Sequence, residues 1–461
     1  MKKITKLLAL ILSAVFCLSL IGCSSGNDES DKIVVFTRDN PTEVATVGKM
    51  LEAFKEKKKS EGAVFDYHVR TISDARYNDD ITKSIAAGTM ADLVYVADEY
   101  LENLALRGVF ENLDPYFANA GFDFTKHDAA AFEISKCVGQ NGEKHLYMVP
   151  RTYDQILIAI NVDVWKDILG ENYEIPTADV NWTWTKLEQV MYDIRKAVDD
   201  DSDINAEEKS TYFPIDLQLG WQPFYNSFIR SFGGYVYDAQ TSTVGMTSAR
   251  TVKAIEKLKD MLDKKYFEVI SSSSFYNKKS PMWLISRPSV TNSLKTDRGI
   301  DNLRFLPIPI YDDAFTGLTN GTSYYSYGSV GFAMYSKAKD KQLAYEYLEF
   351  TLSEQGQKIW AESGIAVPTL LSMQQDPNAE WTKHPSYITG IDQSAFTFND
   401  YKKDYYERIP ATYARTGTPS KYYETVFYTE ARAVFGTPSY WNGGAQYFAE
   451  KAQYQLGNKV N

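Results

Sequence analysis

Short apolar runs alternate along this chain with longer segments in which apolar residues recur every three or four positions. The runs nearest the start of this pattern cover residues 33–36, 64–69 and 92–96. Between the first two runs, apolar side chains recur at helical spacing, at Val44, Val47, Leu51 and Phe54. Runs of this length indicate buried strands, and the intervening periodicity indicates amphipathic helices. Alternation of the two predicts a parallel, doubly wound α/β sheet.

Local signals mark where the expected helices begin and end. Asn40-Pro41-Thr42-Glu43 combines a capping residue, a Pro in the first turn and a Glu three positions after the cap. Gly88 and Gly108 end the next two helices. Further strands are expected at residues 146–150, 156–160, 303–307 and 328–334, and the Tyr-rich last ninety or so residues are expected to be mainly helical.

The first 22 residues have the pattern of a secretory signal. They hold three Lys and no acid, followed by an apolar run over residues 7–21 that is too short for a confident membrane span. Leu20-Ile21-Gly22-Cys23 and the polar residues after it resemble a bacterial lipoprotein signal. The resemblance implies cleavage before Cys23, acylation of its thiol, and attachment to the extracytoplasmic face of the cell membrane through a polar tether over residues 23–32. An ordinary signal peptide with an incidental Cys is the alternative.

Composition narrows the class of protein. The 461-residue chain has a formal net charge of −11, and loss of the three Lys of the signal leaves about −14 on a mature chain of 439 residues. An acidic surface argues against nucleic acid as a partner. Only Cys137 remains besides the signal's Cys17 and the acceptor Cys23, so the mature chain can form no internal disulfide. Its length suggests two or three domains.

Several short motifs, in order, resemble the extracellular solute-binding proteins of family 1. These are receptors of bacterial ABC importers for sugars and related solutes, and the similarity runs from about residue 33 to about residue 371. Ala91 stands where the family usually has Pro. The segments that carry the resemblance are Ile85-Ala86-Ala87-Gly88 with Asp92, Tyr147-Met148-Val149-Pro150, Asn161-Val162-Asp163, Thr183-Trp184, Ser231-Phe232-Gly233-Gly234, and residues 352–358.

The resemblance implies a fold of two α/β lobes joined by several crossover strands. We expect an N-terminal lobe of residues 33–155 with 290–350, and a C-terminal lobe of residues 156–289 with 351–461. The chain should cross between the lobes near residues 156–161 and again near 287–292. A small solute, most simply a mono- or oligosaccharide, would lie between the lobes and be passed to an ABC permease. The resemblance implies a monomeric binding protein without catalytic residues or a cofactor.

The strand order by itself points to a binding edge. In open α/β sheets, ligands bind beyond the carboxyl ends of the strands. The residues that follow the first and third predicted strands are Asp39, Asn40 and Asp98. Asn40 also precedes a helix, so simple capping of that helix is the competing interpretation.

Aromatic residues in predicted loops complete the expected site. Sugars present hydroxyls at their edges and C–H bonds on their faces, which suit carboxylates and aromatic rings respectively. Tyr153 and Asp154 lie at the first expected crossing, and Arg287 lies at the second. The other loop aromatics chosen as ligand contacts are Trp221, Tyr325 and Trp441.

Two other functions stay open at this stage. A secreted enzyme acting on polysaccharide could use a pair of the many carboxylates, although no Gly-x-Ser-x-Gly element or phosphate loop is present. The same binding role could also serve a peptide, a polyamine or an anion. Arg38, Arg151 and Arg287 near the expected cleft leave an anionic ligand open.

A metal site is not expected. Residues 199–208 have alternating oxygen-bearing side chains, as in a calcium loop. They lack the Gly at the sixth position and the Glu at the twelfth that such a loop uses. We therefore interpret the segment as a solvated acidic loop, with a bound calcium ion as the alternative. The four His residues are scattered without metal-ligand spacing.

Overall fold

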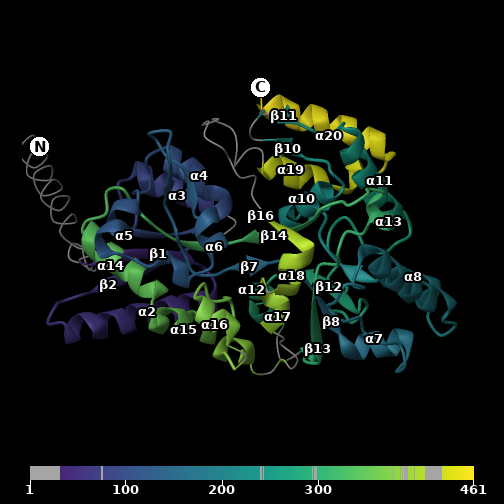
Figure 1. Cartoon of the computed structure of the whole chain (residues 1–461), viewed down its shortest axis with the longest axis horizontal. Coiled ribbons are helices and arrows are strands. Elements are labelled where there is room, and N and C mark those ends of the chain that lie inside the picture. Colours follow the sequence, from purple (N-terminus) through teal and green to yellow (C-terminus); the bar gives the residue numbers. More distant parts are fainter. Residues whose placement is uncertain are drawn as a thin grey trace, which may run out of the picture.

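Two bodies of helices and strands lie side by side along the long axis of the molecule (Figure 1). The computed structural model describes residues 32–460 with the exception of 74–75, 239–240, 242, 293, 295–297, 377, 385, 387, 389–392, 399 and 411–427. Cys23, the expected signal and most of the expected tether lie outside these residues. No helix in the described part of the chain combines the length and the apolar character needed to cross a bilayer.

The first lobe is built on a five-stranded sheet. Its order is β2 (Tyr67–Ile72), β1 (Ile33–Arg38), β3 (Leu93–Ala97), β15 (Val330–Met334) and β6 (Val149–Pro150). β1 pairs in parallel with β2 and β3, as the alternating pattern predicts, whereas β15 is antiparallel to both β3 and β6. The covering helices include α2 (Pro41–Ser60), α3 (Tyr77–Ala86), α4 (Asp98–Leu106), α14 (Lys341–Leu352) and α15 (Glu354–Glu362).

The second lobe is built on a four-stranded sheet. Its order is β13 (Leu303–Pro307), β8 (Leu157–Asn161), β12 (Met282–Ile285) and β9 (Ile215–Asp216). Successive residues of β8 point to opposite faces, so Ile158 and Ile160 join one hydrophobic cluster while Leu157 and Ala159 join another. Burial on both faces explains why this strand appears in the sequence as a continuous apolar run. The surrounding helices include α7 (Val162–Leu169), α8 (Trp184–Asp200), α10 (Gln222–Ser231), α11 (Ala249–Asp263), α19 (Tyr428–Gly436) and α20 (Ala445–Val460).

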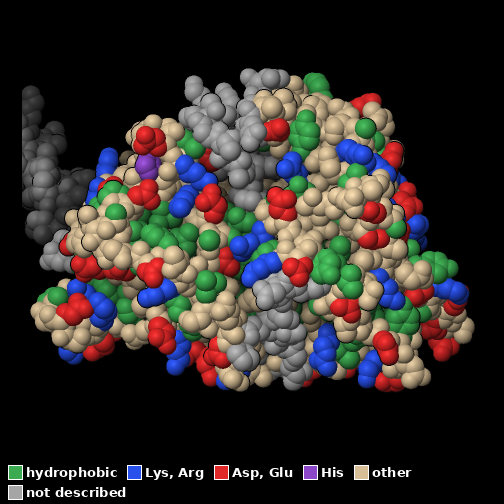
Figure 2. All heavy atoms as spheres, in the orientation of Figure 1, with side chains coloured by type: hydrophobic (Ala, Val, Ile, Leu, Met, Phe, Trp, Pro, Cys, Tyr) green, Lys and Arg blue, Asp and Glu red, His purple; other side chains and the backbone are tan. Residues whose placement is uncertain are grey.

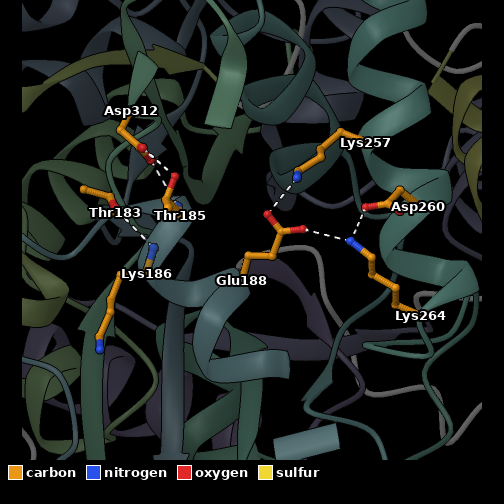
Figure 3. Close-up of polar contacts among 8 residues, drawn as sticks. All are labelled: Thr183, Thr185, Lys186, Glu188, Lys257, Asp260, Lys264 and Asp312. Carbon is orange, nitrogen blue, oxygen red and sulfur yellow. Dashed lines mark hydrogen bonds and ion pairs between the residues drawn. The ribbon is translucent and has the colours of Figure 1, made fainter. Parts of the chain in front are cut away.

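Side-chain contacts hold α8 in place on the second lobe (Figure 3). Thr183 caps the helix by accepting a hydrogen bond from the Lys186 N–H at 3.2 Å. On the next turn Glu188 lies 2.7 Å from the ammonium of Lys257, in α11, and 3.4 Å from that of Lys264, directly after α11. Partly exposed pairs of this kind contribute about 0–1 kcal/mol each, so their main effect is to orient the two helices.

A third, small sheet lies between the lobes. It consists of β16 (Tyr406–Pro410), β14 (Ser323–Gly328) and β7 (Asp154–Gln155), and Figure 1 shows β7 and β14 near the middle of the molecule. β7 lies in the sequence between β6 of the first sheet and β8 of the second, and β14 leads directly into β15 of the first sheet. The chain therefore passes between the lobes more than once.

The structure divides two segments between the lobes differently from the sequence-based boundaries. β13 was expected with the N-terminal lobe, but all five of its residues pair with β8 in the second sheet. α15 was expected with the C-terminal lobe, but its Trp360 belongs to the core of the first lobe, as do Ile365 and Ala366. The physical reason is that the chain returns to the first lobe through β14. Segments before β14, such as β13, stay with the second lobe, and α15, which follows β15, packs on the first.

Two further expectations need correction. Residues 287–292 were expected as the second crossing, but they form a short helix, α12 (Arg287–Asn292), whose Val290 lies in a cluster with β8 and β13 residues. The C-terminal region was expected to be mainly helical, and α19 and α20 agree with this, but β16 pairs in parallel with β14. Strand pairing between distant segments leaves no periodic signal in a five-residue run.

Candidate ligand-binding cavity between the lobes

A cavity of about 180 Å³ lies where the two lobes meet. Figure 2 shows acidic and basic side chains close together in this region of the visible face. The wall from the first lobe includes Arg38, Asp98 and Arg151, and the wall from the second includes Trp221, Gln222 and Pro223. The crossing segments supply Thr152, Asp154, Gln155, Ile156 and residues 326–330, and the second lobe adds Ser286 and Pro288 between β12 and the first turn of α12.

The first sheet places its residues in the cavity through the carboxyl ends of its strands. Arg38 is the last residue of β1, and Asp98 directly follows β3 as the first residue of α4. This is the edge at which ligands bind in open α/β sheets. One carboxylate oxygen of Asp98 accepts a hydrogen bond at 3.3 Å from the backbone N–H of Ser329, between β14 and β15. Asp98 thus links the binding edge to the crossing strands.

Asp154 lies in the crossing strand β7 and contacts the second lobe. Its Oδ1 accepts hydrogen bonds from the backbone N–H of Arg287 at 3.1 Å and from its neighbour Gln155 at 3.0 Å. Since β7 pairs with β14, the carboxyl group lies at the junction of all three sheets. The affinity of a ligand that binds Asp154 would therefore depend on the relative position of the lobes.

Both cavity carboxyls have raised pKa values. Burial raises the pKa of Asp98 to about 8, and the nearby charge of Glu99 adds to the effect. Burial also raises the pKa of Asp154 to about 7, against the backbone hydrogen bonds and the charges of Arg151 and Arg287, which favour the ionised form. Near neutral pH the two groups hold more protons than ordinary carboxyls.

A buried ion pair fixes the wall formed by Arg151. Its Nη1 lies 2.7 Å from Oε1 of Glu43, and both side chains are only 2% exposed. The guanidinium carbon lies 5.6 Å from the ring centroid of Tyr95 and 5.0 Å from that of Trp360. The sequence predicts Glu43 as half of a capping box, but its carboxylate instead holds a cavity residue. The cap of α2 is made by Asn40 alone, which accepts from the Glu43 N–H at 3.1 Å.

Trp221 supplies a half-buried aromatic ring at the start of α10. It occupies the cap position of that helix, followed by Gln222 and by Pro223 in the first turn. Gln222 is 2% exposed, and its Oε1 has no hydrogen-bond partner within the described part of the molecule. Sequence reasoning missed Gln222, although its place directly after a loop Trp was a usable signal.

Asp98, Asp154 and Trp221 are the residues chosen from the sequence that the structure brings together on this cavity. Asp39 is solvent-exposed and does not line it. Asn40 does not line it either, because its side-chain oxygen caps α2. For Asn40, the competing capping interpretation describes the structure.

Tyr153 and Tyr325 were chosen as ligand contacts, but both side chains are buried away from the cavity. Tyr153 is fully buried and stacks on Tyr327, with ring centroids 6.0 Å apart. Tyr325 is in edge-to-face contact with Tyr406 of β16 at 5.0 Å. The cavity lies at the end of β14, where Ser326, Tyr327 and Gly328 line it, and Tyr325 lies too far back along the strand to reach it.

Arg287 and Trp441 also point elsewhere. Arg287 is fully buried, and its Nη2 donates to the backbone carbonyls of Trp381, at 3.0 Å, and His384. Its backbone N–H reaches a cavity residue, Asp154. Trp441 is packed against Phe448 with centroids 4.2 Å apart, and its indole N–H donates to a backbone carbonyl. A turn-rich sequence context placed both residues in loops but did not give the direction of their side chains.

The acidic segment at 199–208 pairs its carboxylates with lysines and an arginine, including Glu208 with the distant Lys279 at 2.8 Å. Asp199 pairs with Arg195 at 2.6 Å and Asp200 with Lys196, while Asn205 caps the short helix α9 (Ala206–Lys209). Among the described residues no group of three or more His, Cys, Asp or Glu side chains is arranged to hold a metal ion.

Solved structures with the same fold include proteins that bind sugars. An ABC substrate-binding protein from Listeria monocytogenes in complex with cycloalternan has a TM-score of 0.69 at 14% identity, with 93% of this chain and 98% of that chain covered. The GacH receptor of Streptomyces glaucescens, solved without ligand and with acarbose, gives 0.66 at 16% identity, with coverage of 93% and 98%. A solute-binding protein from Thermotoga lettingae bound with alpha-D-tagatose gives 0.67 at 13% identity, with coverage of 94% and 100%.

These similarities confirm the two-lobe fold. The sequence itself matches the bacterial extracellular solute-binding protein family over residues 49–389, which is most of the chain. With two lobes, repeated crossings and a cavity at their junction, this chain belongs to the bacterial extracellular solute-binding protein family.

Proposed function

We propose that this protein is an extracytoplasmic binding lipoprotein that captures a small solute, a mono- or oligosaccharide, and delivers it to an ABC-type permease. It acts as a monomer and binds its solute without chemical change. The observation that carries the proposal is the cavity between the lobes, where Asp98 and Asp154 share the lining with the half-buried ring of Trp221.

The lining matches the two kinds of surface that a sugar presents. Carboxyl and amide groups suit the hydroxyl edge, and Asp98, Asp154 and Gln222 supply them. An aromatic ring suits the C–H face, and Trp221 supplies it. Three structural neighbours support the same class of solute, since those proteins were solved with cycloalternan, acarbose or tagatose.

Delivery follows from binding across two lobes. A solute that contacts Asp98 of the first lobe and Trp221 of the second binds best when the lobes are closed, so it shifts the population toward the closed form. The permease would recognise that form. Micromolar affinity requires about 8 kcal/mol, which one stacked ring and several hydrogen bonds can supply.

The same proposal places a lipid on Cys23, which lies outside the described residues. The polar residues that follow it would form the tether to β1. Acyl chains bind a bilayer with roughly 0.8 kcal/mol per buried methylene, so more than one chain gives stable anchoring. Membrane fractionation of cells that carry Cys23→Ser tests the anchor.

Titration of the purified mature chain with a sugar panel tests the binding role. We expect one or more sugars to raise the melting temperature and to give a saturable calorimetric signal. Trp221→Ala should weaken that binding at least tenfold, because it removes the stacking face. Tyr192→Ala, which removes an exposed aromatic side chain from α8, is the matched control and should bind normally. A protein that responds to no sugar would refute the carbohydrate assignment.

A further inference from the structure

The interlobe cavity is small for an oligosaccharide. Its volume is about 180 Å³, which corresponds to about six water molecules at roughly 30 Å³ each. Sites for drug-sized ligands measure roughly 300–1,000 Å³. One six-membered sugar ring with its hydroxyls displaces on the order of six waters of liquid volume, and each further ring nearly as many again. The space therefore matches one ring.

The lining also offers one aromatic face. Chains of sugar rings need a succession of stacking surfaces, one for each ring that is held. Besides Trp221, the aromatic residue among the described lining residues is Tyr327. Its ring already stacks on Tyr153, and the guanidinium of Arg408 lies 5.8 Å from its centroid. Trp221 is left as the stacking surface for a single ring.

In the described part of the chain, the cavity wall carries both buried acceptors and buried donors without a hydrogen-bond partner, and the donors include Nε of Arg151. The Oε1 of Gln222 and the hydroxyl of Ser326 are buried and have no hydrogen-bond partner in the described part of the chain. A buried polar atom in this state costs about 1–3 kcal/mol, which a ligand donor would recover. Asp98 and Asp154 add carboxyl oxygens to the same wall. A ligand rich in hydroxyl groups meets this need, because each hydroxyl can both donate and accept.

The cationic groups nearby give little support to an anionic ligand. Arg151 is already paired with the equally buried Glu43 at 2.7 Å. The guanidinium of Arg287 is directed to backbone carbonyls away from the cavity. Arg38 lines the cavity, but Asp98, Glu99 and Asp154 line it as well. A carboxylate or phosphate would lose its hydration and face a wall with an excess of acidic groups.

We propose that this cavity selects a single uncharged sugar ring, or a cyclic polyol of that size, over both longer saccharides and sugar acids, with Asp98 and Asp154 as specificity-determining residues. The inference rests on the proposed function and adds the size and charge of the solute. The size limit comes from the cavity and from Trp221. The charge limit comes from the excess of acidic groups on the wall, where Asp98, Glu99 and Asp154 outnumber Arg38 and the paired Arg151.

Calorimetric titration of the mature chain at pH 9, where pKa values of about 8 for Asp98 and about 7 for Asp154 leave both carboxyls mostly ionised, tests both limits. The probes are a broad set of neutral pentoses, hexoses and cyclic polyols, the matching uronates, and maltose and maltotetraose. We expect a neutral monosaccharide or cyclic polyol to bind at least tenfold more tightly than either maltose or maltotetraose. Where it has a matching uronate, it should also bind at least tenfold more tightly than that uronate.

Asp98→Asn separates charge selection from folding. Asn has nearly the same shape and keeps an oxygen for the Ser329 N–H, so the fold should persist with an unchanged circular dichroism spectrum. Its preference for the neutral sugar over the uronate should fall at least threefold. Asp79→Asn, the same substitution at an exposed position on α3, is the control and should keep the preference.

The outcomes distinguish this inference from the proposed function. Tighter binding of an oligosaccharide, or equal binding of a sugar and its uronate, would overturn the inference and leave the sugar-binding role standing. An Asp98→Asn preference equal to that of the control would overturn the role given to Asp98. Failure of every probe to bind would overturn both the inference and the carbohydrate assignment.

Discussion

Asp98 and Asp154 lie at positions where ionisation is costly to the folded chain. Each is half-buried against the crossing strands, and each accepts backbone hydrogen bonds that only partly offset the loss of hydration. Binding sites commonly retain such groups because a ligand can supply what the protein does not. Their cost should be visible in the stability of the ligand-free protein.

The pH dependence of stability follows from the direction of the two pKa shifts. In the folded chain the pKa of Asp98 is raised to about 8 and that of Asp154 to about 7, from an ordinary value of 3.8. Between about pH 4 and pH 8 the unfolded chain has released protons that the folded chain still holds. Stability therefore falls as pH rises through this window. At about 1.36 kcal/mol per pKa unit, discounted for partial exposure, the loss from pH 5 to pH 8 should be on the order of 1–3 kcal/mol.

Denaturant unfolding of the ligand-free protein at pH 5 and pH 8 measures this loss. The fall should be smaller in Asp98→Asn than in the unmodified chain, because Asn has no proton to release. The slope is the change in the free energy of unfolding between pH 5 and pH 8. Subtracting the slope of Asp98→Asn from that of the unmodified chain removes the contributions of the other titrating groups. Identical slopes would show that Asp98 ionises normally in the folded protein.

At the scale of elements, the pairing of β15 with β6 requires a glycine. Gly331 pairs with Pro150 of β6, and a Cβ at this position would overlap the backbone carbonyl of Val149. The close approach lets β15, which arrives directly from the crossing strand β14, complete the first sheet. Backbone atoms in a paired strand cannot shift cheaply, so substitution here should strain the sheet.

Gly331→Ala is accordingly expected to lower the free energy of unfolding by about 1–3 kcal/mol. Gly48→Ala provides the opposite control, because Gly48 lies inside α2 and a methyl group there would meet no heavy atom within 4 Å. Replacing a helical Gly by Ala should stabilise the protein by about 0.5–1 kcal/mol. Urea unfolding of both variants measures whether the free energy of unfolding falls in Gly331→Ala and rises in Gly48→Ala. An unchanged free energy of unfolding in Gly331→Ala would mean that β6 can shift to make room for the methyl group.

At the scale of the molecule, the two lobes have separate hydrophobic cores. Leu51 of α2 is fully buried in the core of the first lobe, and Leu258 of α11 is fully buried in that of the second. The lobes are joined by short crossing segments and by the sheet that contains β14. This arrangement allows the lobes to move relative to each other while each core stays intact.

We expect the two cores to respond separately to substitution. Leu51→Ala and Leu258→Ala should each cost about 2–5 kcal/mol through lost burial and a new cavity. Native-state hydrogen exchange should then speed up in the strands of the altered lobe and change little in the other. Equal acceleration in both lobes after either substitution would show that the molecule unfolds as one cooperative unit.

Particular residues show how far sequence reasoning could reach. The rule that ligands bind beyond the ends of strands placed Asp98 on the cavity. It needs only the position at which each strand ends, and that position can be recognised from the local sequence. Trp221 and Asp154 were found because turn residues and a crossing placed them in loops near the cleft. Tyr153, Tyr325, Arg287 and Trp441 were misjudged, since a loop position does not say whether a side chain faces a cavity or a core.

The sequence alone determined the alternation of strands and helices, the parallel start of the first sheet and the family, because these depend on local periodicity and short motifs. Only the tertiary structure decided which lobe holds β13 and α15, which strands cross, and which polar groups meet at the cavity. The pairing of Arg151 with Glu43 belongs to the second kind, since 108 positions separate the two residues. Contacts between distant segments depend on how the packed elements fit together, and no single segment of the sequence determines that fit.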